Sequence, residues 1–336
     1  MSTFSISRLL RGLVLGVAAT VSLPALSEEI TLKYAFFAPA GTFPGKQMTH
    51  WAEEVNKRTN GKVKVETFPG GSLLGAREMW DGVTMGVTDI GLSAPSYDPG
   101  RFPLTSGMAL PLGFENATEA SRVLWEVTNE FQPKEFENFK VLAMFTSEPG
   151  HIQSKEPVRN LEDLANMRLR ATGSGVPVIE ALGGSAVGMS MPDVPQAVQT
   201  GVIDGTMTSR EVLRDFRLAE NLKYVTEYPM VVSTFAAVMD KKKWDALPDD
   251  VKKVLNELGD EMHAWTGRYH DEENVNGALE WAQKEQGLTI LTLPDEETAR
   301  WDAKMAPIVD EWIVATEAKG LPGKKYIERI KELQKQ

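Results

Sequence analysis

The chain has 336 residues, of which 42% are hydrophobic, and it carries 36 basic and 47 acidic side chains. This apolar content is enough for a buried core and excludes extended disorder, and the length predicts two lobes. The net charge of −11 argues against nucleic-acid binding, which needs a basic surface. The absence of cysteine excludes disulfides and thiolate sites, and with four histidines we expect neither a metal nor another cofactor.

The N-terminus has the order of a secretory signal peptide. Arg8 and Arg11 precede an apolar run from Leu13 to Leu23, and Ala25-Leu26-Ser27, with small residues at 25 and 27, follows. The run is too short for the ~20 apolar residues of a bilayer-spanning helix, so a membrane anchor is the less favoured alternative. We expect residues 1–27 to be removed and the mature protein to be soluble and exported.

Strands and helices alternate along the first hundred residues. Alternating apolar and polar residues predict strands at 30–37 and 63–68, and a short apolar segment predicts another at 90–92. Helical spacing predicts helices over 47–59 and 76–85. This alternation indicates an α/β fold with largely parallel sheets.

A weak internal echo joins the two halves of the chain. Residues 83–89, Val-Thr-Met-Gly-Val-Thr-Asp, are matched in pattern by residues 198–204, Val-Gln-Thr-Gly-Val-Ile-Asp. A chance match is the alternative, but the flanking stretches also agree, so the echo predicts two lobes built on one plan. Ligands in open α/β sheets bind beyond the carboxyl ends of the strands. Segments 93–97 and 206–210 are therefore expected to face each other across a cleft.

A long helix is predicted over residues 249–286, which contain no proline. At 1.5 Å per residue an unbroken helix would reach about 57 Å, longer than one small lobe. It therefore bends or bridges both lobes, with Gly259, Gly267 and Gly277 as candidate bends. A further helix is predicted over 295–319.

Enzyme signatures are missing from the sequence, which contains neither a phosphate-binding P-loop nor a nucleophile elbow. His263 and His270 could share a helix face, but no patterned carboxylate accompanies them, so a metal site is not expected. We therefore expect a binding protein rather than an enzyme. A secreted hydrolase or isomerase that uses cleft carboxylates is the alternative.

Two arginines alternate with apolar residues in a predicted strand at 167–171. Period two places Arg168 and Arg170 on one face of that strand. A guanidinium is a planar, permanently charged donor suited to a carboxylate or sulfonate. The alternative is a salt bridge to one of the many surplus acids.

These features resemble the solute-binding proteins of tripartite ATP-independent periplasmic (TRAP) transporters. The resemblance covers about residues 30–322 and is carried by the exported N-terminus and four segments, Thr59 to Val63, Phe68 to Leu73, Met167 to Arg170 and Gln199 to Gly205. It implies a periplasmic, two-lobed α/β protein with a hinge and a long helix spanning both lobes. We expect lobe I at 28–146 plus 235–275 and lobe II at 147–234 plus 276–336.

The resemblance also implies the site. Arg170 falls on the position that forms a two-pronged salt bridge to the ligand carboxylate, and Thr208 or Ser209 on a polar contact position. Arg210 departs from the family, because many relatives carry an apolar residue there. It could supply a second anion contact, which would admit a diacid, but we favour pairing with Asp215 or Glu211.

Further candidate ligand contacts lie near the strand ends. Phe37, Tyr97 and Phe235 would line the apolar part of the ligand, although each is also expected to be partly core. His151 lies near the predicted crossover and is a weaker candidate. The implied partners are a small organic anion and a membrane permease driven by an ion gradient, and we expect a monomer. A binding protein of an ATP-driven importer, or a sensor lobe, stays open as an alternative.

Overall fold

The computed structural model describes residues 29–336, so the expected signal peptide lies outside the described residues. The first of two mixed sheets has the strand order β2-β1-β3-β10-β4. Its strands β1, β2 and β3 are parallel, and β10 runs antiparallel to both β3 and β4. The bounds are β1 Ile30–Phe36, β2 Val63–Phe68, β3 Ile90–Ser93, β4 Phe139–Pro149 and β10 Val232–Asp240, with helices α1 Phe43–Arg58, α2 Met79–Thr84, α3 Ala117–Phe131 and α8 Lys241–Ala246.

The second sheet has the order β11-β9-β5-β8-β6-β7. Strands β6, β7 and β8 are parallel, whereas β5 runs antiparallel to β8 and β9. The bounds are β5 His151–Ser154, β6 Arg168–Ala171, β7 Ser185–Gly188, β8 Gly205–Thr208, β9 Tyr224–Glu227 and β11 Thr289–Thr292, with helices α4 Leu161–Leu164, α5 Gly175–Ala181, α6 Val194–Gln199 and α7 Val212–Asp215. The α/β prediction with two lobes is confirmed.

The internal echo corresponds to repeated geometry. Each sheet contains a β-α-β-α-β unit, β1 to β3 in one and β6 to β8 in the other. In both units the second helix ends at a glycine in the left-handed region, Gly86 with φ 74° and Gly201 with φ 73°. The aspartate that follows, Asp89 or Asp204, accepts a hydrogen bond from the backbone N–H of the adjacent central strand, at 2.8 and 2.9 Å. The two lobes therefore share one plan.

Two extended segments carry the chain between the sheets. The first crosses at Gly150, between β4 and β5, and the second crosses between β9 and β10. They are hydrogen-bonded to each other, because the Gly150 N–H donates to Val231 O at 2.8 Å and the Met230 N–H donates to Gly150 O at 3.0 Å. Such a paired, extended connection is suited to act as a hinge.

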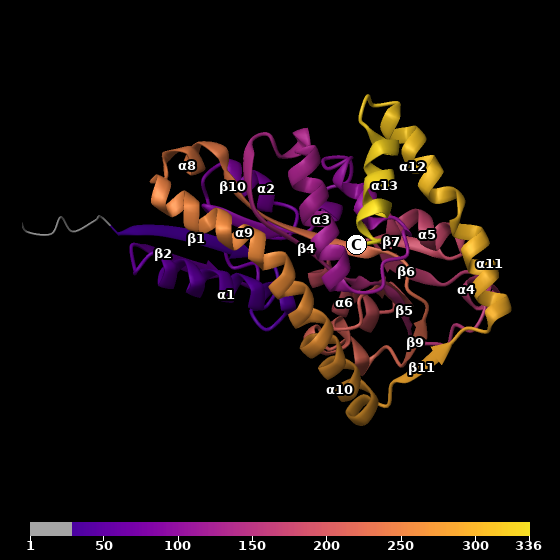
Figure 1. Cartoon of the computed structure of the whole chain (residues 1–336). Helices are drawn as coiled ribbons and strands as arrows, with labels where there is room; N and C mark the ends of the chain where they lie inside the picture. The colour runs from indigo at the N-terminus through magenta and orange to yellow at the C-terminus, as the bar shows by residue number, and fades with distance from the viewer. Residues whose placement is uncertain (1–28) are drawn as a thin grey trace, which may run out of the picture.

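The long helix links the two sheets, as expected (Figure 1). It consists of α9 Asp249–Tyr269, a π-helical turn His270–Val275 and α10 Asn276–Gln286. Helix α9 packs on α1, α3 and β4, and α10 packs on α7 beside the second sheet. The helical hydrogen bonding changes at the π-turn and not at the three glycines. Gly267 instead permits a close approach, since a Cβ there would lie 2.6 Å from Thr118 Cα.

The C-terminal region forms three helices, α11 Asp295–Met305, α12 Pro307–Glu317 and α13 Gly323–Leu333. The prediction of one helix over 295–319 is wrong, because Pro307 has no N–H to continue the ladder and starts a new helix. Helix α11 packs on α4 and α5, whereas α13 returns to α3 beside the first sheet. The boundaries of the lobes in sequence stay a prediction.

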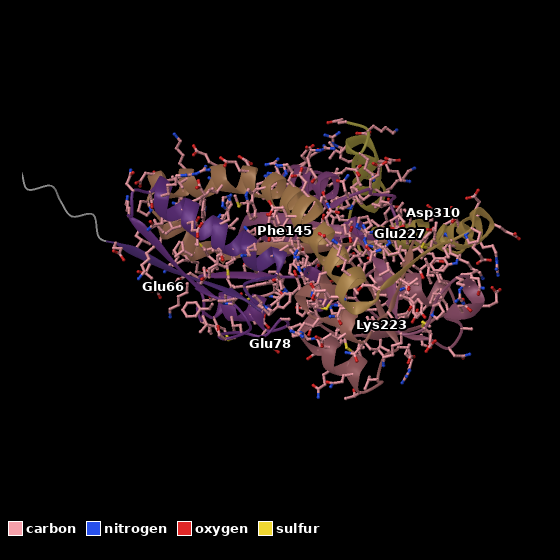
Figure 2. All side chains as sticks on the ribbon, turned by 90° about the horizontal axis from the view of Figure 1, so that it is seen from below. Glu66, Glu78, Phe145, Lys223, Glu227 and Asp310 are labelled. Carbon is pink, nitrogen blue, oxygen red and sulfur yellow. The ribbon has the colours of Figure 1, made fainter. Side chains whose placement is uncertain are left out.

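Apolar side chains fill the layers between the sheets and their helices. Phe145 is fully buried, whereas the exposed side chains of Glu78 and Asp310 lie near the outline of the molecule in Figure 2. Among residues 29–336, no helix combines the length and the apolar character needed to cross a membrane.

Candidate functional site

A cavity lies between the two sheets, with about 490 Å³ of space that protein atoms do not fill and that is partly open to solvent. It is lined from both sides by the residues that end or follow strands β1, β3, β6 and β8. This is the location expected for a ligand in an open α/β fold.

Six of the eight expected site residues line this cavity. They are Phe37, Tyr97, Arg170, Thr208, Ser209 and Phe235. Arg210 and His151 are not among its lining residues. The structure thus brings residues of segments 93–97 and 206–210 together at one cavity. These are the segments that the internal repeat predicts at equivalent strand ends.

Arg170 is a buried cation. It lies on β6 with 3% of its surface exposed, and its Nε donates to Met189 O at 3.0 Å. Among the described residues, no carboxylate oxygen lies within ion-pair distance of its guanidinium. Burial lowers the pKa of Arg170, and the Tyr97 hydroxyl and Asp193 only partly offset that effect. The site therefore contains a positive charge that the protein itself does not neutralise.

Arg168, on the same strand face, differs from Arg170. Its Nη2 lies 2.8 Å from Asp204 Oδ1, and its side chain is 47% exposed. Arg168 does not line the cavity. The salt-bridge alternative therefore holds for Arg168 and does not hold for Arg170.

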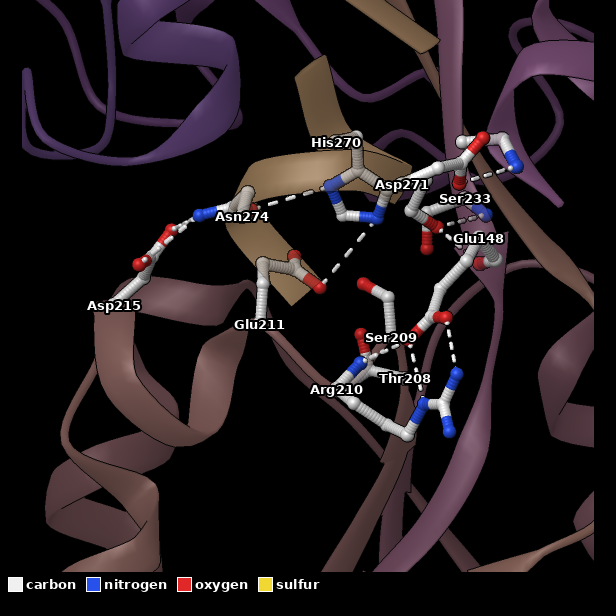
Figure 3. Close-up of polar contacts among 12 residues, drawn as sticks. Glu148, Thr208, Ser209, Arg210, Glu211, Asp215, Ser233, His270, Asp271 and Asn274 are labelled. Atoms are coloured by element: carbon white, nitrogen blue, oxygen red, sulfur yellow. Dashed lines mark hydrogen bonds and ion pairs between the residues drawn. The ribbon is translucent and has the colours of Figure 1, made fainter. Parts of the chain in front are cut away.

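Arg210 is paired with acids other than those expected. Its Nε and Nη2 donate to the two oxygens of Glu148 at 2.9 and 2.7 Å (Figure 3). Its Nη1 donates to Glu227 at 3.1 Å. The expectation of Asp215 or Glu211 as partner is wrong, because the end of β8 faces β4 and not α7. Burial raises the pKa of Glu148, but the Arg210 guanidinium outweighs burial and keeps that pKa below its ordinary value.

His151 is buried outside the cavity, at the start of β5. Burial and the nearby charge of Arg210 lower the pKa of His151 to about 4. A neutral imidazole at this position does not add a second cation to the site.

Aromatic rings form much of the apolar wall. Phe37 packs edge-on against Tyr97 with ring centroids 5.4 Å apart, and Phe43 packs edge-on against Phe235 at the same separation. Sequence analysis missed Phe43, because it started the first helix at residue 47. Thr42 caps that helix by accepting from the Gly45 N–H, and a Thr-Phe-Pro start is the signal that could have located Phe43.

Two acids in the wall were not expected to face the ligand. Glu211 is 4% exposed and its Oε2 lies 3.8 Å from His270 Nε2 in the π-turn. Asp215 accepts a hydrogen bond from Asn274 Nδ2, at 3.2 Å to Oδ2 (Figure 3). Burial raises the pKa of both acids, well above the ordinary value for Glu211. In residues 29–336, no three His, Asp or Glu side chains lie close enough to hold a metal ion.

Comparison with known proteins identifies the family. Residues 34–315 match the model of the bacterial extracellular solute-binding proteins, family 7 (DctP). The chain belongs to this family. Family 7 proteins are the solute-binding components of transporters and not enzymes. This family membership excludes the alternative of a hydrolase or isomerase.

Solved structures of TRAP solute-binding proteins share the fold of this family 7 protein. One from Desulfovibrio salexigens is 45% identical with a TM-score of 0.81, covering 91% of this chain and 96% of that one. A marine metagenome protein specific for aromatic acid ligands, in complex with 3-hydroxybenzoate, is 31% identical with a TM-score of 0.87, covering 92% and 99%. The C4-dicarboxylate-binding periplasmic protein of Rhodobacter capsulatus is 27% identical, covering 91% and 94%. The family and fold thus confirm the resemblance stated from the sequence.

Proposed function

We propose that this family 7 protein binds a small aromatic carboxylate in the cavity between its sheets. The observation that carries the proposal is the buried Arg170 guanidinium, which has no acid partner among the described residues. A carboxylate supplies two acceptor oxygens in the geometry that a guanidinium prefers.

Arg170 also couples binding to closure of the cleft. In an open cleft water solvates the guanidinium, and closure without ligand would leave a buried, unpaired charge. A bound carboxylate offsets that cost, so the closed form is favoured only when the site is occupied. Thr208 and Ser209 at the end of β8 would hydrogen-bond the same ligand.

The aromatic part of the proposal comes from the walls of the cavity. Phe37, Phe43, Tyr97 and Phe235 present ring surfaces there, and such surfaces pack well on a flat ring. Two relatives support this choice, the 31% identical protein with 3-hydroxybenzoate and a 27% identical protein from Rhodoferax ferrireducens with benzoate. A sulfonate in place of the carboxylate is compatible with the same arginine.

The proposed cellular role follows from the family. After removal of residues 1–27 the protein would act in the periplasm as a monomer and deliver its ligand to a TRAP permease. The proposed lobes, 28–146 with 235–275 and 147–234 with 276–336, would open and close about the segments at Gly150 and Val231.

The test compares two arginines of one strand. A thermal-shift screen of organic acids on residues 28–336 identifies ligands, because a ligand of the folded state raises Tm. Calorimetry with benzoate and 3-hydroxybenzoate then measures affinity for the wild type, Arg170→Ala and Arg168→Ala. Loss of a buried charge pair corresponds to about a 100-fold drop or more for Arg170→Ala. Arg168→Ala should keep the wild-type affinity, and an Arg170→Ala protein that also keeps it would refute the carboxylate clamp.

A further inference from the structure

The cavity contains more acid than base. Glu211 and Asp215 both line it, and Arg170 is the one cationic side chain among the described lining residues. An anion-binding site with two carboxyl groups in its wall is unusual, because each of them repels a carboxylate whenever it is ionised.

The other nearby arginines are already used. Arg210 has three of its nitrogen atoms engaged by Glu148 and Glu227. Arg214 lies on α7 with its Nε 3.7 Å from Asp215 Oδ1, and its side chain is 38% exposed. A second carboxylate on the ligand would therefore find no free cation in the cavity and would face Glu211 and Asp215.

One carboxyl oxygen of Glu211 also lacks a hydrogen-bond partner among the described residues. Its Oε2 is buried and has no partner among the described residues, and the same is true of the facing atom, His270 Nε2. At 3.8 Å the two atoms are too far apart to hydrogen-bond each other. Rotation about the last side-chain bond of Glu211 exchanges its two oxygens without moving the backbone. The unpaired oxygen can therefore form a hydrogen bond with a group in the cavity.

Resting on the proposed function, we infer that Glu211 and Asp215 restrict the site to singly charged acids and that Glu211 hydrogen-bonds a hydroxyl group of the ligand. The ligand class is then a hydroxy monocarboxylic acid. A hydroxyl both donates and accepts, so it pairs with a carboxyl group in either protonation state. Burial raises the pKa of Glu211, which makes the neutral, donating form accessible as well. The second carboxylate of a dicarboxylate would be buried in the cavity without a cationic partner, which is costly in free energy.

Two matched ligand series test this inference by calorimetry on the mature protein. The aromatic series is benzoate, 3-hydroxybenzoate and isophthalate, and the aliphatic series is butyrate, 4-hydroxybutyrate and succinate. In the series that binds, the hydroxy acid should bind about 10-fold more tightly than the parent acid, as expected for one hydrogen bond to a buried group. The diacid should bind at least about 10-fold more weakly than the parent acid.

Variants of Glu211 separate the two roles. In Glu211→Ala the affinity ratio of hydroxy acid to parent acid should fall toward one, because the partner is gone. In Glu211→Gln the ratio should be largely kept, since the amide still hydrogen-bonds, and the penalty on the diacid should shrink. Arg168→Ala serves as the surface control, and the Tm of each variant shows whether it is folded.

Each outcome decides one of the two proposals. A wild-type protein that binds a diacid as tightly as its parent acid, or that ignores the hydroxyl group, overturns this inference and leaves the carboxylate function intact. An unchanged hydroxyl preference in Glu211→Ala also overturns it, and assigns Glu211 a purely structural role beside the π-turn. Binding that survives in Arg170→Ala, or no binding in either series, overturns the proposed function itself. Binding of the aliphatic series alone overturns its aromatic part. If Glu211→Ala does not fold, the wild-type and Glu211→Gln ratios still decide the inference.

Discussion

Arg210 and Glu148 form a two-pronged ion pair that joins the two sheets beside the hinge. Glu148 lies near the end of β4 in the first sheet, and Arg210 follows β8 in the second. Both guanidinium contacts are shorter than 3 Å, and the backbone N–H of Arg210 also donates to Glu148 Oε1 at 2.8 Å. The pair therefore neutralises the second arginine near the site and ties the two sheets together.

Removing one partner of this pair should destabilise the protein. Arg210→Met would leave the Glu148 carboxylate buried without its cation, and the free energy of unfolding should fall by about 3–5 kcal/mol. Urea denaturation measures the loss. The double variant Arg210→Met with Glu148→Gln should recover part of it, because no buried charge is then left unpaired. A loss below about 1 kcal/mol, typical of an exposed pair, would contradict this assignment.

Two glycines of the long helix, Gly267 and Gly277, should respond in opposite directions to alanine. In Gly267→Ala the new Cβ would lie 2.6 Å from Thr118 Cα, a backbone atom that cannot easily move. We expect a loss of about 1–3 kcal/mol from this overpacking. Gly277→Ala is the matched control, because the nearest atom is the terminal Nη1 of the flexible Arg214 side chain. That variant should gain about 0.5–1 kcal/mol from helix propensity, and equal effects on Tm at both positions would argue against the close packing.

His151 should make the protein less stable in acid. Its pKa is about 4 in the folded protein, against an ordinary value of 6.5. Between these values the unfolded chain binds more protons, so this contribution to stability is complete above pH 6.5 and is lost as the pH falls to 4. The loss amounts to about 3 kcal/mol.

The variant His151→Gln has no titrating group at this position, so its stability should fall less than that of the wild type between pH 7 and 4. Denaturant unfolding across this range measures the difference in the free energy of unfolding between the two proteins. Contributions from acidic residues are the same in both proteins and cancel in this difference. His50→Gln is the control, because His50 is only partly buried against Trp265 and should give a smaller difference. Parallel pH curves for the wild type and His151→Gln would show that the pKa of His151 is not lowered in the folded protein.

Much of the architecture was predictable because it is encoded locally. The strand β2 has the predicted bounds. The predicted helix that is followed by a glycine and then an aspartate is present once in each lobe. Both features follow from short-range sequence patterns. Arg170 could be named as a candidate partly for the same reason. Its position on a strand with period two, together with the family resemblance, placed it at the cleft.

The sequence by itself determined the alternating α/β order, the doubled plan of the lobes and the long helix, because each depends on neighbours within a few turns or one strand. The local pattern left Arg168 and Arg170 as candidates, and the family resemblance singled out Arg170. Only the tertiary structure decided that Arg210 pairs with Glu148, 62 residues away, and that Phe43 lines the cavity. It also decided that Glu211 is buried with no Lys or Arg partner among residues 29–336. Side chains on separate sheets meet through distances in space that no local spacing encodes. Burial shifts the pKa of an acid and of an unpaired guanidinium, and these side chains become buried only when the two lobes are packed together.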